Sequence, residues 1–193
     1  MLIGTQMVAK GHDFPGVRLV GVIAADVGLH LPDFRAAERT FQLLTQVAGR
    51  AGRDTAPGRV IVQTFVPEHY ALRPVVGHDY ESFYAQELAH RASLGFPPFG
   101  RLASVLVSAK LEADAAAAAA QLARAIAAAA EGCELLGPAP APLPRLRGRY
   151  RQQLLLKGDD ESVRRAARAA LDAITRLQEG VQAAVDMRPW SML

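Results

Sequence analysis

Two consecutive prolines, Pro97 and Pro98, constrain this chain more than any other feature of its sequence. Proline has no backbone N–H, fixes its own φ angle, and pushes the preceding residue out of the helical region. The helical pattern over residues 80–94 therefore has to end at Gly95, before an extended hinge over residues 95–99. We expect this hinge to separate two regions that each form their own secondary structure.

Strands and a helix alternate before the hinge. Residues 18–25 are an apolar run rich in β-branched side chains, which is typical of a parallel strand covered on both faces, and residues 59–65 predict another strand. Between them, residues 38–48 carry apolar side chains at helical spacing, and the first ten residues predict one more short strand. The pattern predicts an α/β sheet. Because sheets usually have about four to six strands, we expect these three to be the cut edge of a larger one.

A second pattern of six elements follows the hinge. The predicted strands are residues 102–108, 135–136, 150–157 and 181–187. The predicted helices are residues 111–130 and 161–177, the second with inward side chains at Val163, Ala167, Ala170, Leu171 and Ile174. This order is the split βαβ plan of the ferredoxin-like fold, an α+β fold in which two helices cover one face of a four-stranded antiparallel sheet. Residues 138–144, with four prolines, predict a stiff polyproline-II connector between the central strands.

The composition excludes several classes of protein. Cys133 is the single cysteine among 193 residues, so the chain has neither an intrachain disulfide nor a multi-cysteine zinc cluster. No window approaches the roughly 18 consecutive apolar residues of a membrane-spanning helix, and the start lacks signal-peptide features. We expect a cytoplasmic protein with no membrane partner. Among 22 basic residues only three are lysines; arginine suits phosphate groups, although genomic base composition produces the same bias.

A basic, glycine-rich turn is the sharpest local motif. The sequence QVAGRAGR begins with Gln46 on the last turn of a predicted helix. Arg50 and Arg53 can grip a phosphate group with their planar forks. Gly49 and Gly52 would let the backbone approach a ligand closely. A basic turn without a ligand would have the same composition.

A second polar loop follows the first predicted strand. It begins at residues 4–6 and continues to Lys10 and Asp13. Both loops then lie at the carboxyl ends of sheet strands, which is where α/β folds bind ligands. His12 lies in this loop, but one histidine without further ligands does not make a metal site.

Two motifs and several further segments resemble a known family. The sequence GTQMVAKGHDF of residues 4–14 resembles motif V of the superfamily 2 helicases, and residues 46–53 resemble motif VI. Within that superfamily, the residues of both motifs are most similar to those of the PriA family of primosomal replication-restart helicases. Other segments that resemble this family are residues 33–39, 67–69, 94–98, 136–141 and 185–186. The similarity covers nearly the whole chain.

The resemblance implies a division into domains. Residues 1–75 would be the C-terminal part of a RecA-like second helicase lobe with a parallel sheet, and residues 76–99 a connecting helix and hinge. Residues 100–193 would be a ferredoxin-like C-terminal DNA-binding domain. Residues 33–39 carry alternating charges, and a salt-bridged helix start capped by Asp33 explains them equally well.

The resemblance also implies roles for the motif residues. Arg50 and Arg53 would reach the β- and γ-phosphates of ATP as catalytic residues, and Gln46 would sense the nucleotide. The implied ATP-binding residues are Gly11, Asp13, Gly49 and Gly52, with Asp13 pairing with the arginines or contacting ribose. The implied contacts to single-stranded DNA are Thr5, Gln6 and Lys10. For Lys10, a solvated loop lysine is the alternative.

Four arginines alternate near the predicted third strand of the second region. They are Arg145, Arg147, Arg149 and Arg151, with Tyr150 beside them. In one strand they would form a stripe on one face, and such a density of like charge favours binding of a phosphate backbone. Tyr150 would offer a surface on which an exposed base stacks. A solvated, arginine-rich loop is the alternative. For Cys133, a small buried residue is favoured over a nucleophile.

The family resemblance implies an ATP-dependent 3′–5′ DNA helicase that binds stalled replication forks and starts replication restart by primosome assembly. Its cofactors would be ATP with Mg²⁺, shared with a first lobe, and Zn²⁺ bound by upstream cysteines, with no zinc ligands in this chain. Its partners would be forked and single-stranded DNA, primosome proteins, single-stranded DNA-binding protein, and the replicative helicase or its loader. We expect it in the cytoplasm, associated with the nucleoid.

Two motifs that ATP hydrolysis needs are missing from the sequence. There is no Gly-x-x-x-x-Gly-Lys-Ser/Thr loop to hold phosphates and no acidic box to hold magnesium. We therefore interpret the chain as a C-terminal piece that is inactive by itself. One alternative is a non-catalytic scaffold that binds forks within the primosome, and another is a ferredoxin-like regulatory domain that binds a small anion.

Overall fold

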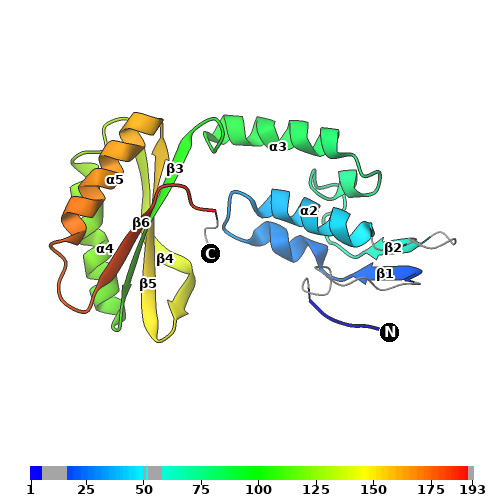
Figure 1. Cartoon of the computed structure of the whole chain (residues 1–193), viewed down its shortest axis with the longest axis horizontal. Helices are drawn as coiled ribbons and strands as arrows, with labels where there is room; N and C mark the ends of the chain where they lie inside the picture. The colour runs from blue at the N-terminus through cyan, green and yellow to red at the C-terminus, as the bar shows by residue number, and fades with distance from the viewer. Residues whose placement is uncertain (6–16, 50, 52–57, 191–193) are drawn as a thin grey trace. The chain divides into compact units, whose positions relative to one another are not determined.

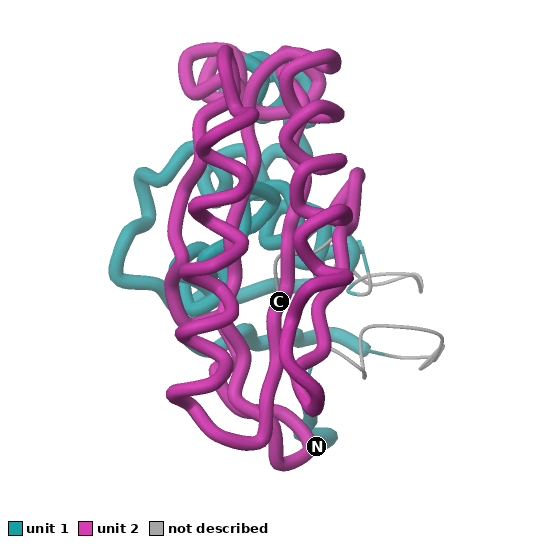
Figure 2. The backbone as a smooth tube through the Cα atoms, turned by 90° about the vertical axis from the view of Figure 1, so that its left-hand side faces the viewer, with its two compact units in different colours: residues 1–88 teal, residues 89–193 magenta. Residues whose placement is uncertain are grey.

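The computed structural model describes residues 1–5, 17–49, 51 and 58–190. The chain divides into two compact units, residues 1–88 (unit 1) and residues 89–193 (unit 2), which are coloured separately in Figure 2. The division falls within a helix, a few residues before the predicted hinge. Within the described residues, no helix is both long enough and apolar enough to span a lipid bilayer.

Unit 1 contains a small parallel sheet. Strands β1 (Leu19–Val22) and β2 (Arg59–Val62) pair in parallel, with Leu19 opposite Arg59. The chain passes from β1 to β2 through a 3-10 helix, η1 (Ala25–His30), and helix α2 (Ala36–Ala48). After β2 come a second 3-10 helix, η2 (Arg73–Val75), and helix α3 (Tyr80–Leu94) (Figure 1). The parallel pairing across a helical connection confirms the predicted α/β character.

Two details of the predicted sheet in unit 1 are wrong. A short buried strand was expected in the first ten residues, but residues 1–5 are exposed and belong to no helix or strand, and residues 6–10 lie outside the described residues. Strand β1 is also not covered on both faces, since Leu19 is 62% exposed. Apolar, β-branched runs favour extended backbone, but which other elements cover a strand depends on the surrounding fold.

Aromatic rings form the core of unit 1. The ring of Phe41 on α2 stacks on that of Phe83 on α3, with centroids 4.1 Å apart and an angle of 7° between the planes. Leu44, Leu72 and Val75 complete the cluster around them. The bounds of α3 agree with the sequence prediction, and its inward face places Phe83 against α2.

Unit 2 contains a four-stranded antiparallel sheet. Its elements are β3 (Arg101–Ala109), α4 (Glu112–Ala127), β4 (Cys133–Leu146), β5 (Arg149–Gly158), α5 (Asp160–Ile174) and β6 (Gln182–Asp186). The spatial order of the strands is β4-β5-β3-β6, and each neighbouring pair is antiparallel. Helices α4 and α5 lie side by side on one face of the sheet (Figure 1). This order and these layers confirm the predicted ferredoxin-like fold.

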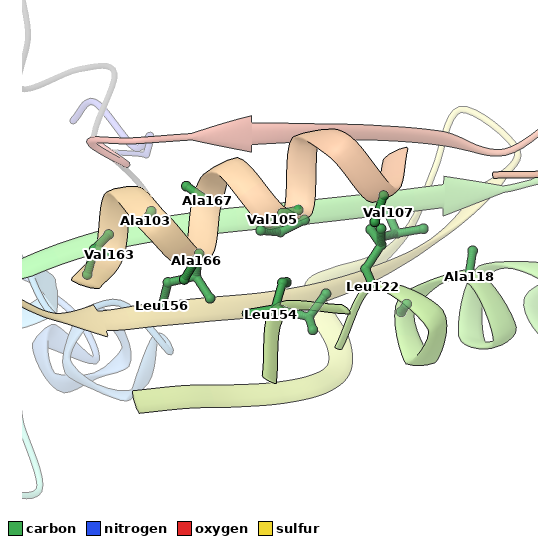
Figure 3. Packing of buried hydrophobic residues seen from close by; sticks show 14 residues of the cluster. Ala103, Val105, Val107, Ala118, Leu122, Leu154, Leu156, Val163, Ala166 and Ala167 are labelled. Carbon is green, nitrogen blue, oxygen red and sulfur yellow. The ribbon is translucent and has the colours of Figure 1, made fainter. Parts of the chain in front are cut away.

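The core of unit 2 lies between the sheet and the two helices. Val105 and Val107 on β3 and Leu154 and Leu156 on β5 point toward the helices, where Leu122 of α4 meets them (Figure 3). Alanines on α4 and α5 let the helices approach the sheet closely.

One side chain predicted to lie inward on α5 does not. Leu171 is 47% exposed, whereas Ala166 and Ala170 are fully buried. Leu171 is four residues beyond Ala167 and therefore about 40° further around the helix, which is enough to reach solvent.

The proline-rich segment is a strand rather than a connector. Residues 138–144 lie inside β4, and β4 pairs only with β5 among the described strands. Proline fits there because an edge strand needs N–H groups on one side alone. The register shifts between Leu136 and Ala139, where Gly137 has a φ of 94°. A Cβ at Gly137 would come within 2.7 Å of the Gln153 carbonyl oxygen, so only glycine fits.

Candidate nucleic-acid interface

Most of the site residues predicted in the N-terminal loops lie outside the described residues. These are Gln6, Lys10, Gly11, Asp13, Arg50, Gly52 and Arg53. Thr5 is described and is exposed.

Helix α2 positions Gln46 and Gly49, the two predicted site residues of the glycine-rich turn that lie among the described residues. Gln46 lies on the last turn of α2, as predicted, and is exposed. Gly49 caps the helix with an ordinary helical φ of −68°, and its N–H donates to the Thr45 carbonyl oxygen at 3.0 Å. A Cβ at Gly49 would be 3.6 Å from that oxygen, an ordinary contact. The fold does not itself require glycine here, so close approach to a ligand stays a prediction.

Asp33 organises the turn before α2. Its Oδ2 lies 2.8 Å from Nη1 of Arg39, and its Oδ1 accepts the backbone N–H of Arg35 at 2.9 Å. The Asp33 side chain is 1% exposed. These contacts favour the structural explanation of this charged segment, although the residue at the N-cap position is Arg35 and not Asp33.

The four alternating arginines do not lie on one strand. Arg145 is near the end of β4, and Arg149 and Arg151 begin β5. Arg147 and Gly148 form the two-residue turn of the hairpin between these strands, with φ angles of 50° and 77°. Positive φ at both positions is typical of a type I′ turn. The prediction of a single stripe on one strand is therefore wrong. In the sequence, Gly148 between two extended segments was the feature that indicated this turn.

The hairpin divides the arginines between the two faces of the sheet. Tyr150 pairs with Ala109 and Arg145, which places them on the side of the helices. Arg151 pairs with Ser108 and lies on the opposite face, together with Arg149. The guanidinium carbon of Arg145 lies 5.1 Å from the Tyr150 ring centroid, so Arg145 covers one side of the ring predicted to stack on a base.

Arg149 is a structural residue. Its Nη2 donates to the carbonyl oxygens of Ser108 at 2.7 Å and Gly180 at 2.8 Å, and its Nε donates to the Ser108 hydroxyl at 3.1 Å. These bonds join the end of β3 to the loop before β6. Arg151 likewise donates to the Leu143 carbonyl oxygen at 3.2 Å. Arg145 and Arg147, in contrast, are exposed at the hairpin tip.

A second group of arginines surrounds a pocket at the other end of β3. The pocket has a volume of about 280 Å³ and is lined by Arg101, Asp160, Val163, Arg164, Met187 and Arg188. We call this group the arginine pocket. Its residues come from the start of β3, the first turns of α5 and the segment after β6. Sequence reasoning missed it because these residues are far apart in the chain and form no local motif.

Cys133 and the carboxylates show no sign of a reactive or metal site. Cys133 is half-buried against the core of unit 2, and burial raises the pKa of its thiol. A raised pKa keeps the thiol neutral and weakly nucleophilic. In the part of the chain that the structure describes, no three His, Cys, Asp or Glu side chains gather as metal ligands do.

Comparison with known proteins gives one consistent result. The family model described as "Primosomal protein N C-terminal domain" matches residues 92–190. The replication restart protein PriA of Bacillus subtilis is 46% identical over 197 residues, which cover 100% of this chain and 24% of the relative. The protein of the same name from Treponema pallidum is 47% identical over 195 residues, which cover 100% of this chain and 30% of the relative.

Similarity of this extent shows common ancestry over the full chain. The chain spans 24% and 30% of the length of these two curated relatives, and the protein of the same name from Synechocystis is 46% identical over 81% of the chain. The matched domain coincides with the ferredoxin-like sheet and its helices. The chain therefore belongs to the family of the replication restart protein PriA, and it corresponds to the C-terminal part of such a protein.

Proposed function

We propose that this chain is the C-terminal part of an ATP-dependent 3′–5′ DNA helicase that binds stalled replication forks and initiates restart by primosome assembly. The observation that carries this proposal is the match over the whole chain to proteins named for replication restart. The proposed partners are forked and single-stranded DNA, primosome proteins, single-stranded DNA-binding protein, and the replicative helicase or its loader. The proposed location is the cytoplasm, at the nucleoid.

The hairpin tip is the DNA contact that we propose within unit 2. Arg145 and Arg147 are exposed there, and Arg147 projects from a two-residue turn. Exposed guanidiniums on a narrow hairpin can approach a phosphate backbone without steric hindrance from the sheet. Tyr150 and Arg145 together present a flat cation and ring that could stack on an unpaired base.

The nucleotide contacts that we propose are in unit 1. Arg50 and Arg53 would hold the β- and γ-phosphates of ATP, with Gly11, Asp13 and Gly52 near the nucleotide. The exposed position of Gln46 beside Gly49 at the end of α2 fits contact with a bound nucleotide. Bound Mg²⁺ would neutralise phosphate charge, and the arginines would stabilise the charge that develops during phosphoryl transfer. Zn²⁺ belongs in our proposal to an upstream part of the parent protein.

A binding experiment tests the DNA contact. The chain carrying Arg145→Ala and Arg147→Ala is compared with one carrying Arg124→Ala and Arg168→Ala, which removes the same charge from exposed positions on α4 and α5. With forked DNA, we expect the hairpin variant to bind more weakly and to show a smaller salt dependence, because phosphate contacts release counterions. Equal affinities of the two variants would contradict the hairpin contact.

Hydrolysis assays separate the helicase from the non-catalytic scaffold. In the full-length parent protein, Arg50→Ala with Arg53→Ala should abolish DNA-stimulated ATP hydrolysis if the protein is a helicase. A scaffold would show no such hydrolysis before or after the change. Both the helicase hypothesis and the scaffold hypothesis include fork binding. The DNA-binding assay therefore tests the DNA contact, and the hydrolysis assay tests whether the parent protein is a helicase.

A further inference from the structure

In the arginine pocket, a single carboxylate orients two of the guanidiniums. Asp160 Oδ1 lies 2.7 Å from Nε of Arg101, and Asp160 Oδ2 lies 2.9 Å from Nε of Arg164. One carboxylate therefore holds two arginines through their Nε atoms. Within the described residues, the terminal amino groups of these two arginines have no other hydrogen-bond or ion-pair partner. They are available to a bound group.

The charges of the pocket are not balanced. Arg101, Arg164 and Arg188 contribute three positive charges, and Asp160 is the only acidic residue among the described residues that line the pocket. The guanidinium of Arg188 has no ion-pair or hydrogen-bond partner among the described residues, although its backbone N–H donates to Asp186. Asp160 compensates only part of this charge, and the surplus of positive charge around one cavity attracts a further anion.

The N-terminus of helix α5 adds an electrostatic potential at the pocket that favours an anion. Asp160 and Arg164 lie in the first turns of α5, a helix of 15 residues whose N-terminus carries a partial positive charge. The volume of about 280 Å³ is ample for one phosphate group with its hydrating water. Side-chain exposures of 47% for Arg101 and 68% for Arg164 show that a ligand can enter from solvent.

We infer that the arginine pocket binds a phosphate group, and that a phosphodiester of DNA supplies it. This inference rests on the proposed function, because DNA is the phosphate-bearing partner named there. A phosphate offers several oxygens in different directions, and it can therefore meet three guanidiniums better than a flat carboxylate does.

The position of the pocket suits a second contact on the same DNA. Arg101 begins β3, and Ala109 at the other end of β3 pairs with Tyr150 of the hairpin. Nine residues of strand span about 26 Å, which corresponds to about eight base-pair steps of duplex DNA. The pocket and the hairpin tip would then contact phosphates several nucleotides apart.

A phosphate titration tests the pocket without DNA. The arginine Nε–H signals of the chain are followed by NMR while inorganic phosphate is added, with chloride at matched ionic strength as the reference. We expect saturable shifts for Arg101 and Arg164 with phosphate, and no saturable shift of the remaining Arg101 signal after Arg164→Ala with Arg188→Ala. Identical responses to phosphate and chloride would overturn the inference.

A DNA-binding comparison tests the proposed source of the phosphate. The variant with Arg164→Ala and Arg188→Ala is compared with the Arg124→Ala and Arg168→Ala control, which loses the same charge. We expect the pocket variant to bind forked DNA more weakly and the slope of log affinity against log salt to fall by about one, with a smaller change in the control. Circular dichroism checks that both variants remain folded.

The outcomes separate this inference from the proposed function. If the hairpin variant loses affinity for DNA while the pocket variant matches its control, the pocket inference fails and the proposed function stands. If the unchanged chain binds no DNA, the proposed DNA contact fails, and the phosphate titration still decides whether the pocket holds phosphate. A synthetic acidic peptide is a further probe: binding that needs the pocket arginines, with DNA binding independent of them, would overturn the assignment to DNA.

Discussion

The two units of this chain are stabilised by different kinds of core. Unit 2 has a four-stranded sheet covered by two helices, and its core contains aliphatic side chains that are fully buried. Among its described residues, unit 1 has two strands of four residues, and the stacked rings of Phe41 and Phe83 lie in its core. Apolar side chains on its sheet remain exposed. A complete two-layer fold leaves polar residues at its ends available for binding, whereas a small sheet concentrates its stability in a few contacts.

The largest expected effect is in unit 1. Phe83→Ala removes one ring of the stack and should cost about 3–5 kcal/mol, because the cavity left by a buried ring fills poorly. Hydrogen exchange should then accelerate in β1, β2 and α2 while β3 and β5 keep their protection. Phe65→Ala is the control, since Phe65 is 85% exposed. Equal acceleration in both units would show that they do not fold independently.

A smaller loss is expected in the core of unit 2. Leu154→Ala should lower the free energy of unfolding by about 2–5 kcal/mol, because Leu154 is fully buried beneath the helices. Leu171→Ala, at an exposed position, should change it by less than about 0.5 kcal/mol. Urea unfolding followed by circular dichroism measures both. Similar losses would mean that α5 packs by a different face.

Arg149 and Arg147 should show opposite effects. Arg149→Ala removes the bonds to Ser108 and Gly180 and should cost about 1.5 kcal/mol, the low end for charged groups because the site is partly exposed. Arg147→Ala should leave stability nearly unchanged and weaken DNA binding. Thermal unfolding and a DNA titration on each variant measure the pair. A loss of affinity without loss of stability in the Arg149 variant would contradict its structural role.

The smallest effect is expected at the start of α5. Asp159 caps this helix by accepting the Ser162 N–H at 2.7 Å, and this hydrogen bond lowers the pKa of the carboxyl group. Because the folded-state pKa is lowered, the ionised cap stabilises the fold at neutral pH, and its contribution disappears as pH falls through that lowered pKa. Asp159→Ala should therefore lower the melting temperature at pH 7 and have less effect in acid.

Asp159→Asn provides the matched control for the cap. Asparagine caps helices about as well as aspartate but does not titrate, so its melting temperature at pH 7 should stay close to that of the unchanged chain. The difference between the two proteins should then change on acidification. A pH-independent difference would show that the charge of Asp159 does not contribute.

Local patterns predicted the elements well where neighbouring residues decide the structure. The bounds of α3 followed from helical spacing and from the glycine and prolines after it. The order of elements in unit 2 predicted the ferredoxin-like fold because few topologies fit that order. Gln46 on the last turn of α2 was predicted for the same local reason.

The predictions that failed concern features that are decided by where a segment lies in the fold rather than by its neighbouring residues. Prolines at 138–144 excluded a central strand, and nothing local indicated that this segment was an edge strand. The arginine stripe failed because the turn at Arg147 and Gly148 reverses the chain within the alternating pattern. The arginine pocket could not be predicted, since the packing of α5 against β3 brings its residues together.

The most direct test of this account measures how salt affects the binding of forked DNA to four forms of the chain. They are the unchanged chain, the hairpin variant, the pocket variant and the variant that combines both. If unit 2 contacts phosphates at both ends of its sheet, each pair of substitutions should reduce the salt dependence by about one contact, and the combined variant should show the sum. An unchanged salt dependence in the combined variant would contradict the account.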